Sequence, residues 1–467
     1  MLNTRSIKAS YLDTVALLKL AIPLILSGIV QSSVGFTSTF FLAQLSVNDL
    51  AAGSLVSRMF VTIMVMIWGT LFSVSVLVAN KRGAKDKEAI VDVLRDGIFL
   101  GIILVIPASI FLWNITSILL WAGQDPAIVM IAQPYIHALV WGFLPDFVGL
   151  VLIQFLIGLG HTRTNLVYSL FWVPCNIFFN YIFMFGKLGL PVYGIEGIGW
   201  GTTVAYWVTT LALLFYFLPH RYYRSYFKGI FQFKRTKYLG ELWSIGFPMG
   251  LLLCVELGFF LTITLMMGQL STEILAAYQI TLQYLIILSM VYFGIAEAVT
   301  VRIAHQLGAN QINLINRIAM LGILIATVCM SVIAVIYYFF PERLIGLDLD
   351  MYSEKNAAVV SYAKQFFTLC ALFQLVQATG IVLRGALRGL KETRFTLMSS
   401  VFCLWVVGIP VGYYLSHNLQ WGGNGLWWGM IIGALLTAVL LYLKFQSEVK
   451  KLVLEEDASL CYETEVL

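Results

Sequence analysis

The stretch "SVSVLVANKRGAKDKEAI", residues 73–90, lines up with "AVTVRIAHQLGANQINLI", residues 298–315, at a shift of 225 residues. Identical positions along this alignment include Val74 and Val299, Val76 and Val301, Ala79 and Ala304, Gly83 and Gly308, and Ala84 and Ala309. Self-similarity at a fixed period is the mark of a repeated architecture. The chain is therefore predicted to fold as two similar halves.

The similarity extends beyond these two stretches. Four further matches are Pro23 with Pro248, "QLSVNDLAA" from Gln44 with "QLSTEILAA" from Gln269, "IGLGHTR" from Ile157 with "RGLKETR" from Arg388, and "GIEGIGWG" from Gly194 with "GGNGLWWG" from Gly422. The first two keep the shift of 225, whereas the third corresponds to a local shift of 231. Short insertions between matching segments explain the change of shift.

The composition places both halves in a membrane. Hydrophobic residues make up 60% of the 467 residues and charged residues 11%, whereas a soluble protein carries about 25% charged residues. The apolar residues gather in blocks long enough to span ~30 Å of hydrocarbon. We read twelve such blocks, at about residues 16–42, 52–78, 97–121, 134–158, 166–186, 196–218, 242–266, 276–304, 318–340, 361–383, 395–415 and 424–446.

The predicted fold is an all-α integral membrane protein, with twelve transmembrane helices in two six-helix pseudo-symmetric lobes. The expected parts are an N-lobe of spans one to six (1–218), a basic cytoplasmic linker (219–238), a C-lobe of spans seven to twelve (239–446) and a cytoplasmic tail (447–467). Because six is even, both lobes have the same orientation, as in some secondary transporters that bind substrate near the midplane between repeats.

Basic residues gather in alternate loops. Lys and Arg are concentrated near residues 81–95 and 221–237, before the first span and after the last. The intervening loops are poor in basic residues, and this asymmetry follows the positive-inside rule. We therefore expect both termini in the cytoplasm and no nucleic-acid partner. The six cysteines are scattered without a CxxC, so neither a disulfide nor a zinc site is expected.

Two carboxylates interrupt the spans. Glu256 lies in "LLLCVELGFFLTI", residues 251–263, and Asp146 lies in "GFLPDFVGL". An ionised carboxylate in hydrocarbon costs about 2.5 kcal/mol or more, so each must be neutral, paired or facing water. The repeat aligns Glu256 with Gln31 and Asp146 with Gln377, so each half carries one acid and one glutamine at crossed positions.

An acid of this kind can exchange a proton for a cationic ligand. A dry surrounding favours the protonated carboxyl group, and an approaching cation favours the carboxylate. We expect Glu256 and Asp146 to take part in ion coupling or substrate binding, although Glu256 could instead be a protonated structural donor and Asp146 could only cap a kink.

Other polar residues form polar faces on the first, fifth and tenth spans. The residues expected to join the ion-coupling or substrate site are Gln31, Ser38, Gln374, Gln377, Asn176 and Asn180. For the two asparagines, a structural hydrogen bond between helices is an equally good interpretation. Glu297 and Arg302 are interpreted as a structural ion pair, with each other or with Arg384.

No enzyme motif of the GxxxxGK[ST], HExxH or GxSxG kind is present, so we expect no enzymatic activity and no organic cofactor. The energy for transport would then come from an ion gradient.

Several motifs together resemble the multidrug and toxic compound extrusion (MATE) family, in its NorM-like branch. They are "KLAIPLILSGIVQSS" in the first span, "FGKLGLPVYGIEGIGWGT" between spans five and six, "VTVRIAHQLGAN" at the end of the eighth and "ALRGLKETR" after the tenth. The resemblance implies a V-shaped two-lobe fold that exports amphipathic organic cations against inward H⁺ or Na⁺. It also implies a role in cation coupling for Glu256.

The chain departs from that branch at two acids. Ser38 in "GFTST" and Gln377 in the tenth span stand where NorM-like members tend to carry aspartate. A hard cation such as Na⁺ wants several oxygen ligands and usually more than one carboxylate. We therefore favour proton coupling, with the metal question open, and expect Asp146 to replace part of the lost charge.

The expected function is an ion-coupled antiporter that exports organic cations by alternating access. It would act as a monomer in the plasma membrane, or in the inner membrane of a Gram-negative cell, with the drug, the coupling ion and the bilayer as partners. The alternative is a flippase for lipid-linked or polysaccharide substrates, for which Arg58, Arg384 and Arg388 are the candidate phosphate-binding residues.

Overall fold

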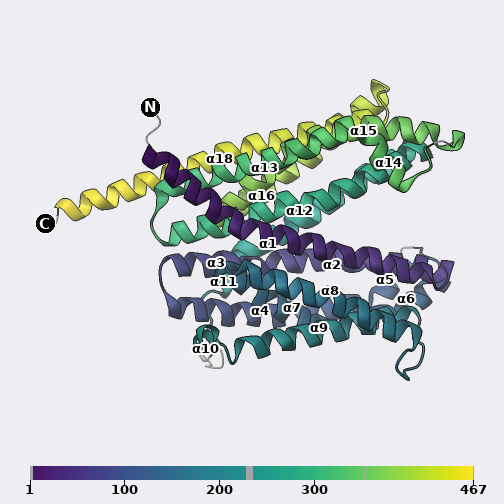
Figure 1. Ribbon diagram of the computed structural model, residues 1–467, viewed down its shortest axis with the longest axis horizontal. Helices are drawn as coiled ribbons and strands as arrows, with labels where there is room; N and C mark the ends of the chain where they lie inside the picture. The colour runs from purple at the N-terminus through teal and green to yellow at the C-terminus, as the bar shows by residue number, and fades with distance from the viewer. Residues whose placement is uncertain (1–3, 122, 228–234, 352, 466–467) are drawn as a thin grey trace. The chain divides into compact units, whose positions relative to one another are not determined.

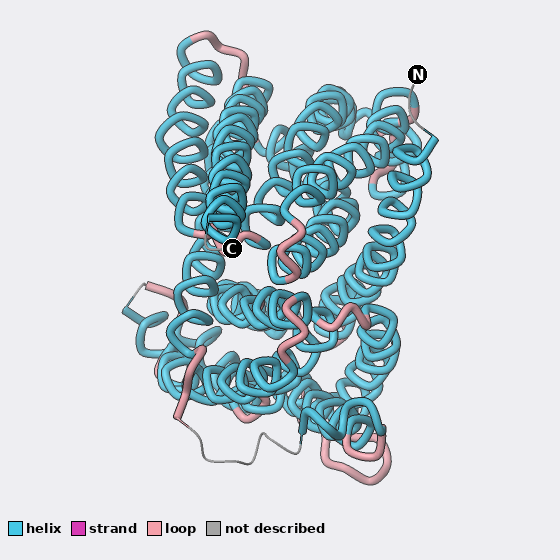
Figure 2. Tube along the Cα trace, turned by 90° about the vertical axis from the view of Figure 1, so that its left-hand side faces the viewer, coloured by secondary structure: helices cyan, strands magenta, loops and turns pink. Residues whose placement is uncertain are grey.

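A computed structural model describes residues 4–121, 123–227, 235–351 and 353–465, which form helices and connecting loops (Figure 2). Figure 1 labels the main helices. In chain order they are α1 Thr4–Ala43, α2 Val47–Leu71, α3 Ser73–Gly83, α4 Lys87–Trp113, α5 Ile115–Trp121, α6 Pro126–Val140, α7 Phe143–Gly158, α8 Thr162–Phe185, α9 Ile195–Phe217, α10 Arg221–Phe227, α11 Leu239–Leu270, α12 Thr272–Gly308, α13 Ile312–Phe339, α14 Pro341–Asp348, η1 Glu354–Asn356, α15 Ala357–Gly389, α16 Arg394–Ser400, η2 Val401–Gly408, α17 Ile409–Tyr413, η3 Tyr414–Asn418 and α18 Gly423–Glu465.

The spans match the predicted blocks. Ten helical segments are long and apolar enough to cross a membrane, and two bent pairs, α4 with α5 and α6 with α7, raise the number to twelve if each pair is one span. The prediction of an all-α, twelve-span membrane fold is confirmed. Residues 228–234 of the predicted linker and residues 466–467 of the tail lie outside the described residues, whereas residues 447–465 continue α18.

The chain divides into two compact units, and two long helices belong to both. One unit consists of residues 1–25 and 251–467, and the other of residues 26–250. The boundaries therefore fall inside α1 and inside α11. The predicted lobe boundaries at 218 and 239 follow the repeat instead, and they stay a prediction.

The repeat is visible in the backbone turns. Lys85 and Asn310, which are 225 residues apart, both have a positive φ, of 57° and 53°. Each turn is closed in the same way: the amide of Asp86 donates to the carbonyl of Lys81, and the amide of Gln311 donates to that of Gln306. This left-handed C-terminal turn satisfies carbonyls that the helix end leaves without partners.

Helix starts repeat as well. Ser46 caps α2 by accepting a hydrogen bond from the amide of Asp49 at 3.0 Å, and Ser271 caps α12 by accepting one from Ile274 at 3.1 Å. Both serines come from the matched "QLS" segments, and Ser is a preferred N-cap because its hydroxyl accepts from an otherwise unpaired amide.

Packing inside the halves is also repeated. A Cβ on Gly97 of α4 would lie 2.9 Å from Val74 of α3, and a Cβ on Gly322 of α13 would meet Val299 of α12 in the same way. These pairs are related by the shift of 225. The glycines allow the second and third spans of each half to approach closely, as small residues do in membrane bundles.

The fifth and sixth spans of the first half pack through a GxxxG face. Gly197 lies against the backbone of Met184, and Gly201 lies against Asn180 on α8. The matching residues in the second half, Gly425 and Gly429, lie against the segment 408–416. Backbone-to-backbone packing of this kind gains van der Waals contact where lipid provides no hydrophobic drive.

Polar contacts hold the starts of the two shared helices. Asp13 on α1 binds Arg302 of α12 at 3.3 Å and Arg317 of α13 at 3.4 Å. At the other start, the buried carboxylate of Asp96 on α4 accepts the amides of Lys237 and Tyr238, both at 2.8 Å. A carboxylate here satisfies the unpaired amides at the beginning of α11 and complements its dipole.

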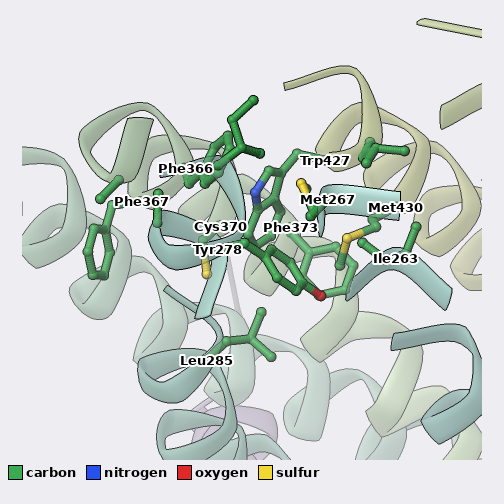
Figure 3. Packing of buried hydrophobic residues seen from close by; sticks show 14 of the residues in the cluster. Ile263, Met267, Tyr278, Leu285, Phe366, Phe367, Cys370, Phe373, Trp427 and Met430 are labelled. Carbon is green, nitrogen blue, oxygen red and sulfur yellow. The ribbon is translucent and has the colours of Figure 1, made fainter. Parts of the chain in front are cut away.

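Aromatic side chains fill the core of the unit that contains α15. Figure 3 shows Phe366 and Phe373 of α15 close to Trp427, with Tyr278 beside it. The ring centroids of Tyr278 and Trp427 are 5.9 Å apart in a T-shaped arrangement, one of the favoured aromatic geometries.

The Gly201 contact yields a stability test. Gly201→Ala should destabilise the protein by about 1–3 kcal/mol, because the new methyl group must push α9 away from α8. Thermal unfolding of the purified protein in detergent would measure the loss. Gly35→Ala is the matched control, since no heavy atom lies within 4 Å of its added Cβ. Equal unfolding temperatures for the two variants would contradict the close packing.

Candidate functional site

A bend between α6 and α7 positions Asp146. The two helices meet at 49°, and Pro145 removes the amide that would otherwise donate to the carbonyl of Trp141. The indole Nε1 of Trp207 on α9 donates to that carbonyl instead, at 3.2 Å. The bend is thus satisfied inside the protein, as every backbone group in hydrocarbon must be.

Two threonines of α9 complete the support. The hydroxyl of Thr203 donates to the carbonyl of Ala138 at 2.7 Å, and that of Thr210 donates to the carbonyl of Pro145 at 2.8 Å. Thr203, Trp207 and Thr210 are spaced by four and three residues and so share one helical face. This face of α9 donates hydrogen bonds to the backbone carbonyls of the bend just before Asp146.

The carboxylate of Asp146 has one hydrogen-bond donor from a side chain. The Nε1 of Trp68 on α2 donates to its Oδ2 at 3.0 Å. Within the described part of the chain, no lysine, arginine or histidine forms an ion pair with Asp146. Asp146 is half-buried, so it remains accessible to a ligand.

Three aromatic residues, Trp68, Tyr168 and Tyr206, lie near this carboxylate. Tyr168 of α8 and Tyr206 of α9 lie within electrostatic range of Asp146. Phe60 contacts Trp68 with ring centroids 6.5 Å apart, and also Phe143 at 6.1 Å. An acid among aromatic faces suits a flat organic cation, which both the charge and the ring quadrupoles attract.

Glu256 has a different environment. Its Oε1 accepts a hydrogen bond from Nη1 of Arg384 on α15, and both side chains are buried, with each residue 8% exposed. Of the three states expected for this acid, the structure selects the paired one. Trp405 of η2 holds the same turn of α11, because its indole donates to the carbonyl of Val255 at 3.2 Å.

The predicted polar face of α15 extends from this ion pair. Gln374 and Gln377 are buried, and neither amide atom of Gln374 has a hydrogen-bond partner among the described residues. Farther along, Arg388 binds Glu297 and also donates from Nε to the hydroxyl of Thr300 at 3.1 Å. The face therefore holds two arginines, each with its own carboxylate.

The expected pairing of Glu297 with Arg302 requires correction. Glu297 binds Arg388, and Arg302 binds Asp13. Residues five apart on a helix do not face each other, whereas residues three or four apart do, and partners on other helices therefore have better geometry. Both residues do form structural ion pairs, with different partners, and Arg384 belongs to Glu256.

Gln31 and its neighbour Ser27 contact α8. The amide of Gln31 donates to Ser169 at 2.8 Å, and Ser27 accepts from Asn165 at 3.2 Å. Both pairs are four residues apart on their helices, so they form a short ladder between α1 and α8. Ser38 lies farther along α1 and is half-buried.

Asn176 and Asn180 form a buried network with α9. Asn180 donates to the Oδ1 of Asn176 at 2.9 Å, Asn176 donates to Thr202 at 3.3 Å, and Thr202 donates back to Asn180 at 3.3 Å. Each is 1% exposed. This arrangement matches the interhelical interpretation of the two asparagines.

Sequence reasoning missed Trp68, Trp207 and the threonines of α9. Their type and spacing in an apolar helix gave no sign of a partner 65 or more residues away. A charge count could have suggested Arg384, because it is a second buried charge in the same half as Glu256. No three His, Cys, Asp or Glu side chains of the described residues are grouped to hold a metal ion.

Comparisons with known proteins agree with this architecture. The MatE family model matches residues 23–182 and 248–414. The chain is 32% identical to the "Probable multidrug resistance protein NorM" of Pseudomonas putida, over 94% of this chain and 95% of that protein. It is also 32% identical to the "Multidrug resistance protein NorM" of Burkholderia vietnamiensis, over 93% and 94%.

Solved structures share the fold. A MOP superfamily transporter from Pyrococcus furiosus has a TM-score of 0.84 at 20% identity, covering 94% of this chain and 96% of that chain. An outward-facing multidrug resistance MATE family transporter has a TM-score of 0.82 at 19% identity, covering 94% and 96%. The protein is thus a helical membrane transporter rather than an enzyme. The chain belongs to the MatE family.

The bend supplies a second test. Trp207→Phe keeps the ring but leaves the carbonyl of Trp141 without a donor, which should cost about 1–3 kcal/mol of stability. Trp200→Phe on the same helix is the control, because Trp200 donates to the side chain of Glu196 and not to a backbone carbonyl. Thermal unfolding compares the two, and a larger loss for Trp200→Phe would refute the role assigned to Trp207.

Proposed function

We propose that this protein exports amphipathic organic cations in exchange for protons, by alternating access between its two halves. The names of the curated relatives, which are multidrug resistance proteins, support the export of drugs. The observation that carries the proposal is Asp146, a half-buried carboxylate among aromatic rings with a single neutral side-chain donor.

Asp146 has the properties that exchange requires. While no cation is bound, the partly desolvated carboxyl group is less costly in its protonated form. An organic cation that enters the ring cluster pairs with the carboxylate and displaces the proton. The same carboxyl group therefore holds either a proton or a drug, and this mutual exclusion couples the two fluxes.

We assign the exchanging acid to Asp146 rather than to Glu256. The resemblance implied cation coupling at Glu256, but the carboxylate of Glu256 is bound to Arg384. We propose that Gln31, Ser38, Gln374, Gln377, Asn176 and Asn180 act around the substrate path or form its walls.

Proton coupling is favoured over sodium coupling at Asp146. Na⁺ prefers several oxygen ligands, usually with more than one carboxylate. The side chains near Asp146 include the indole of Trp68 and the phenols of Tyr168 and Tyr206. An indole N–H donor cannot coordinate a cation, whereas a proton needs only the carboxylate itself.

The setting follows from the charge pattern. We propose that the protein lies in the plasma membrane as a monomer, with both ends in the cytoplasm, because basic residues gather in the loops on that side.

A phosphate-binding flippase is the less favoured alternative. Such a protein needs basic side chains free to hold a phosphate or pyrophosphate. Two of its three candidates, Arg384 and Arg388, already have carboxylate partners in Glu256 and Glu297. Arg58 is exposed on α2 and would have to act alone.

Asp146→Asn tests the proposal. In vesicles that contain the purified protein, an imposed pH gradient should drive uptake of a fluorescent organic cation through the wild-type protein, and the Asn variant should give only background uptake. Trp68→Phe, which removes the single donor but keeps a ring, should give intermediate uptake. Glu342→Gln, at an exposed ion pair with Lys364, is the control.

Full pH-driven uptake by a correctly folded Asp146→Asn variant would exclude Asp146 as the exchanging acid. Uptake driven equally well by a Na⁺ gradient at constant pH would exclude proton coupling.

A further inference from the structure

We propose that Arg384 is a built-in counter-ion for Glu256, a guanidinium fixed to the chain in the place where a free monovalent cation would otherwise bind. Glu256 would then be a permanently compensated charge, and the half that contains α11 and α15 would exchange no ion at this acid. This proposal rests on the proposed function only for what the ion pair means for transport, because ion binding at Glu256 can be measured without transport.

The geometry of the pair supports this role. Nη1 of Arg384 donates to Oε1 of Glu256, and each residue is 8% exposed. A charge-assisted hydrogen bond of this kind is about twice as strong as a neutral one. The two residues come from different helices, so tertiary packing brings them together rather than local sequence.

The guanidinium has no other carboxylate to bind. Arg388, one turn farther along α15, has its own partner in Glu297. Among the described residues, Nε of Arg384 is buried without a hydrogen-bond partner. Cys403 of η2 is a further titratable group within electrostatic range of Arg384. The hydrogen bonding of Arg384 is therefore directed at Glu256.

Trp405 of η2 also holds the turn of α11 that carries the acid. Trp405 donates to the carbonyl of Val255, and its ring would lie 3.1 Å from a Cβ added to Gly258. These contacts fix the turn that carries Glu256. Because this turn is already fixed, little conformational entropy is lost when the carboxylate pairs with the guanidinium.

Competition with free ions follows from the charges. A Na⁺ ion or a proton at Glu256 would have to displace Arg384 or sit beside it, and like charges at short range in a buried site repel strongly. A displaced guanidinium would be left buried without a counter-charge, which is costly. Asp146 has no such partner, and the two acids therefore differ in whether an ion can reach them.

Removal of Arg384 should expose the hidden site. We would measure thermal unfolding of the purified full chain at alkaline pH, in NaCl or in choline chloride of equal ionic strength. Wild-type protein should unfold at the same temperature in both salts. Arg384→Gln leaves the buried Glu256 carboxylate uncompensated and adds an amide oxygen as a further ligand on the facing helix. It should therefore gain a saturable, Na⁺-specific rise in unfolding temperature, because a ligand that binds only the folded state stabilises it.

Two companion variants assign the effect. Arg384→Gln combined with Glu256→Gln should lose the Na⁺-specific rise, since the carboxylate is gone. Arg384→Lys should behave as the wild type, because it keeps a fixed positive charge.

Either of two results would overturn the proposal. One is a Na⁺-specific rise in the wild type that the double Gln variant lacks, which would mean that Glu256 already binds free ions. The other is a folded, monodisperse Arg384→Gln variant without any Na⁺-specific rise. If Arg384→Gln alone does not fold, the comparison of the wild type with the double variant still decides. The Na⁺ dependence of the unfolding temperatures is measured separately, so a failure of pH-driven uptake would contradict the proposed function without contradicting the role of Arg384.

Discussion

In hydrocarbon, each polar group that finds no partner inside the protein costs several kcal/mol, and this constraint shapes the chain from its backbone to its acids. Pro145 frees the carbonyl of Trp141, and Trp207 of α9 satisfies it. Glu256 brings a charge into the core, and Arg384 of α15 neutralises it. The same rule that makes the spans helical also decides which side chains must meet between them.

Close packing of the helix backbones allows these contacts between side chains. Gly201 lets α9 lie against α8 at the asparagine network, and Gly97 lets α4 lie against α3. The second half repeats the latter contact at Gly322 and Val299. Because lipid is as apolar as leucine, contact area rather than water exclusion holds such helices together. Glycine at these positions therefore contributes through the approach it permits.

The two intramembrane acids illustrate two solutions to one problem. Glu256 is stabilised by a fixed charge, and this solution leaves its carboxylate occupied. Asp146 receives one indole hydrogen bond and lies near two tyrosines, and no basic side chain of the described residues forms an ion pair with it. A compensated acid contributes to structure, whereas an uncompensated one can be neutralised in turn by a proton and by a cationic ligand.

The sequence by itself determined the helical membrane class, the twelve spans and the repeat, because hydropathy and self-similarity are local properties that survive without coordinates. The matched turns at Lys85 and Asn310 confirm the predicted alignment. It also located both acids, but it could not choose among a neutral, paired or hydrated Glu256. It offered Arg302 or Arg384 as partners for Glu297, whereas the structure pairs Glu297 with Arg388. Those choices depend on which face each helix presents to its neighbours. Only the tertiary structure, which brings Arg384 to Glu256 across 128 residues and Trp68 to Asp146 across 78, could decide them.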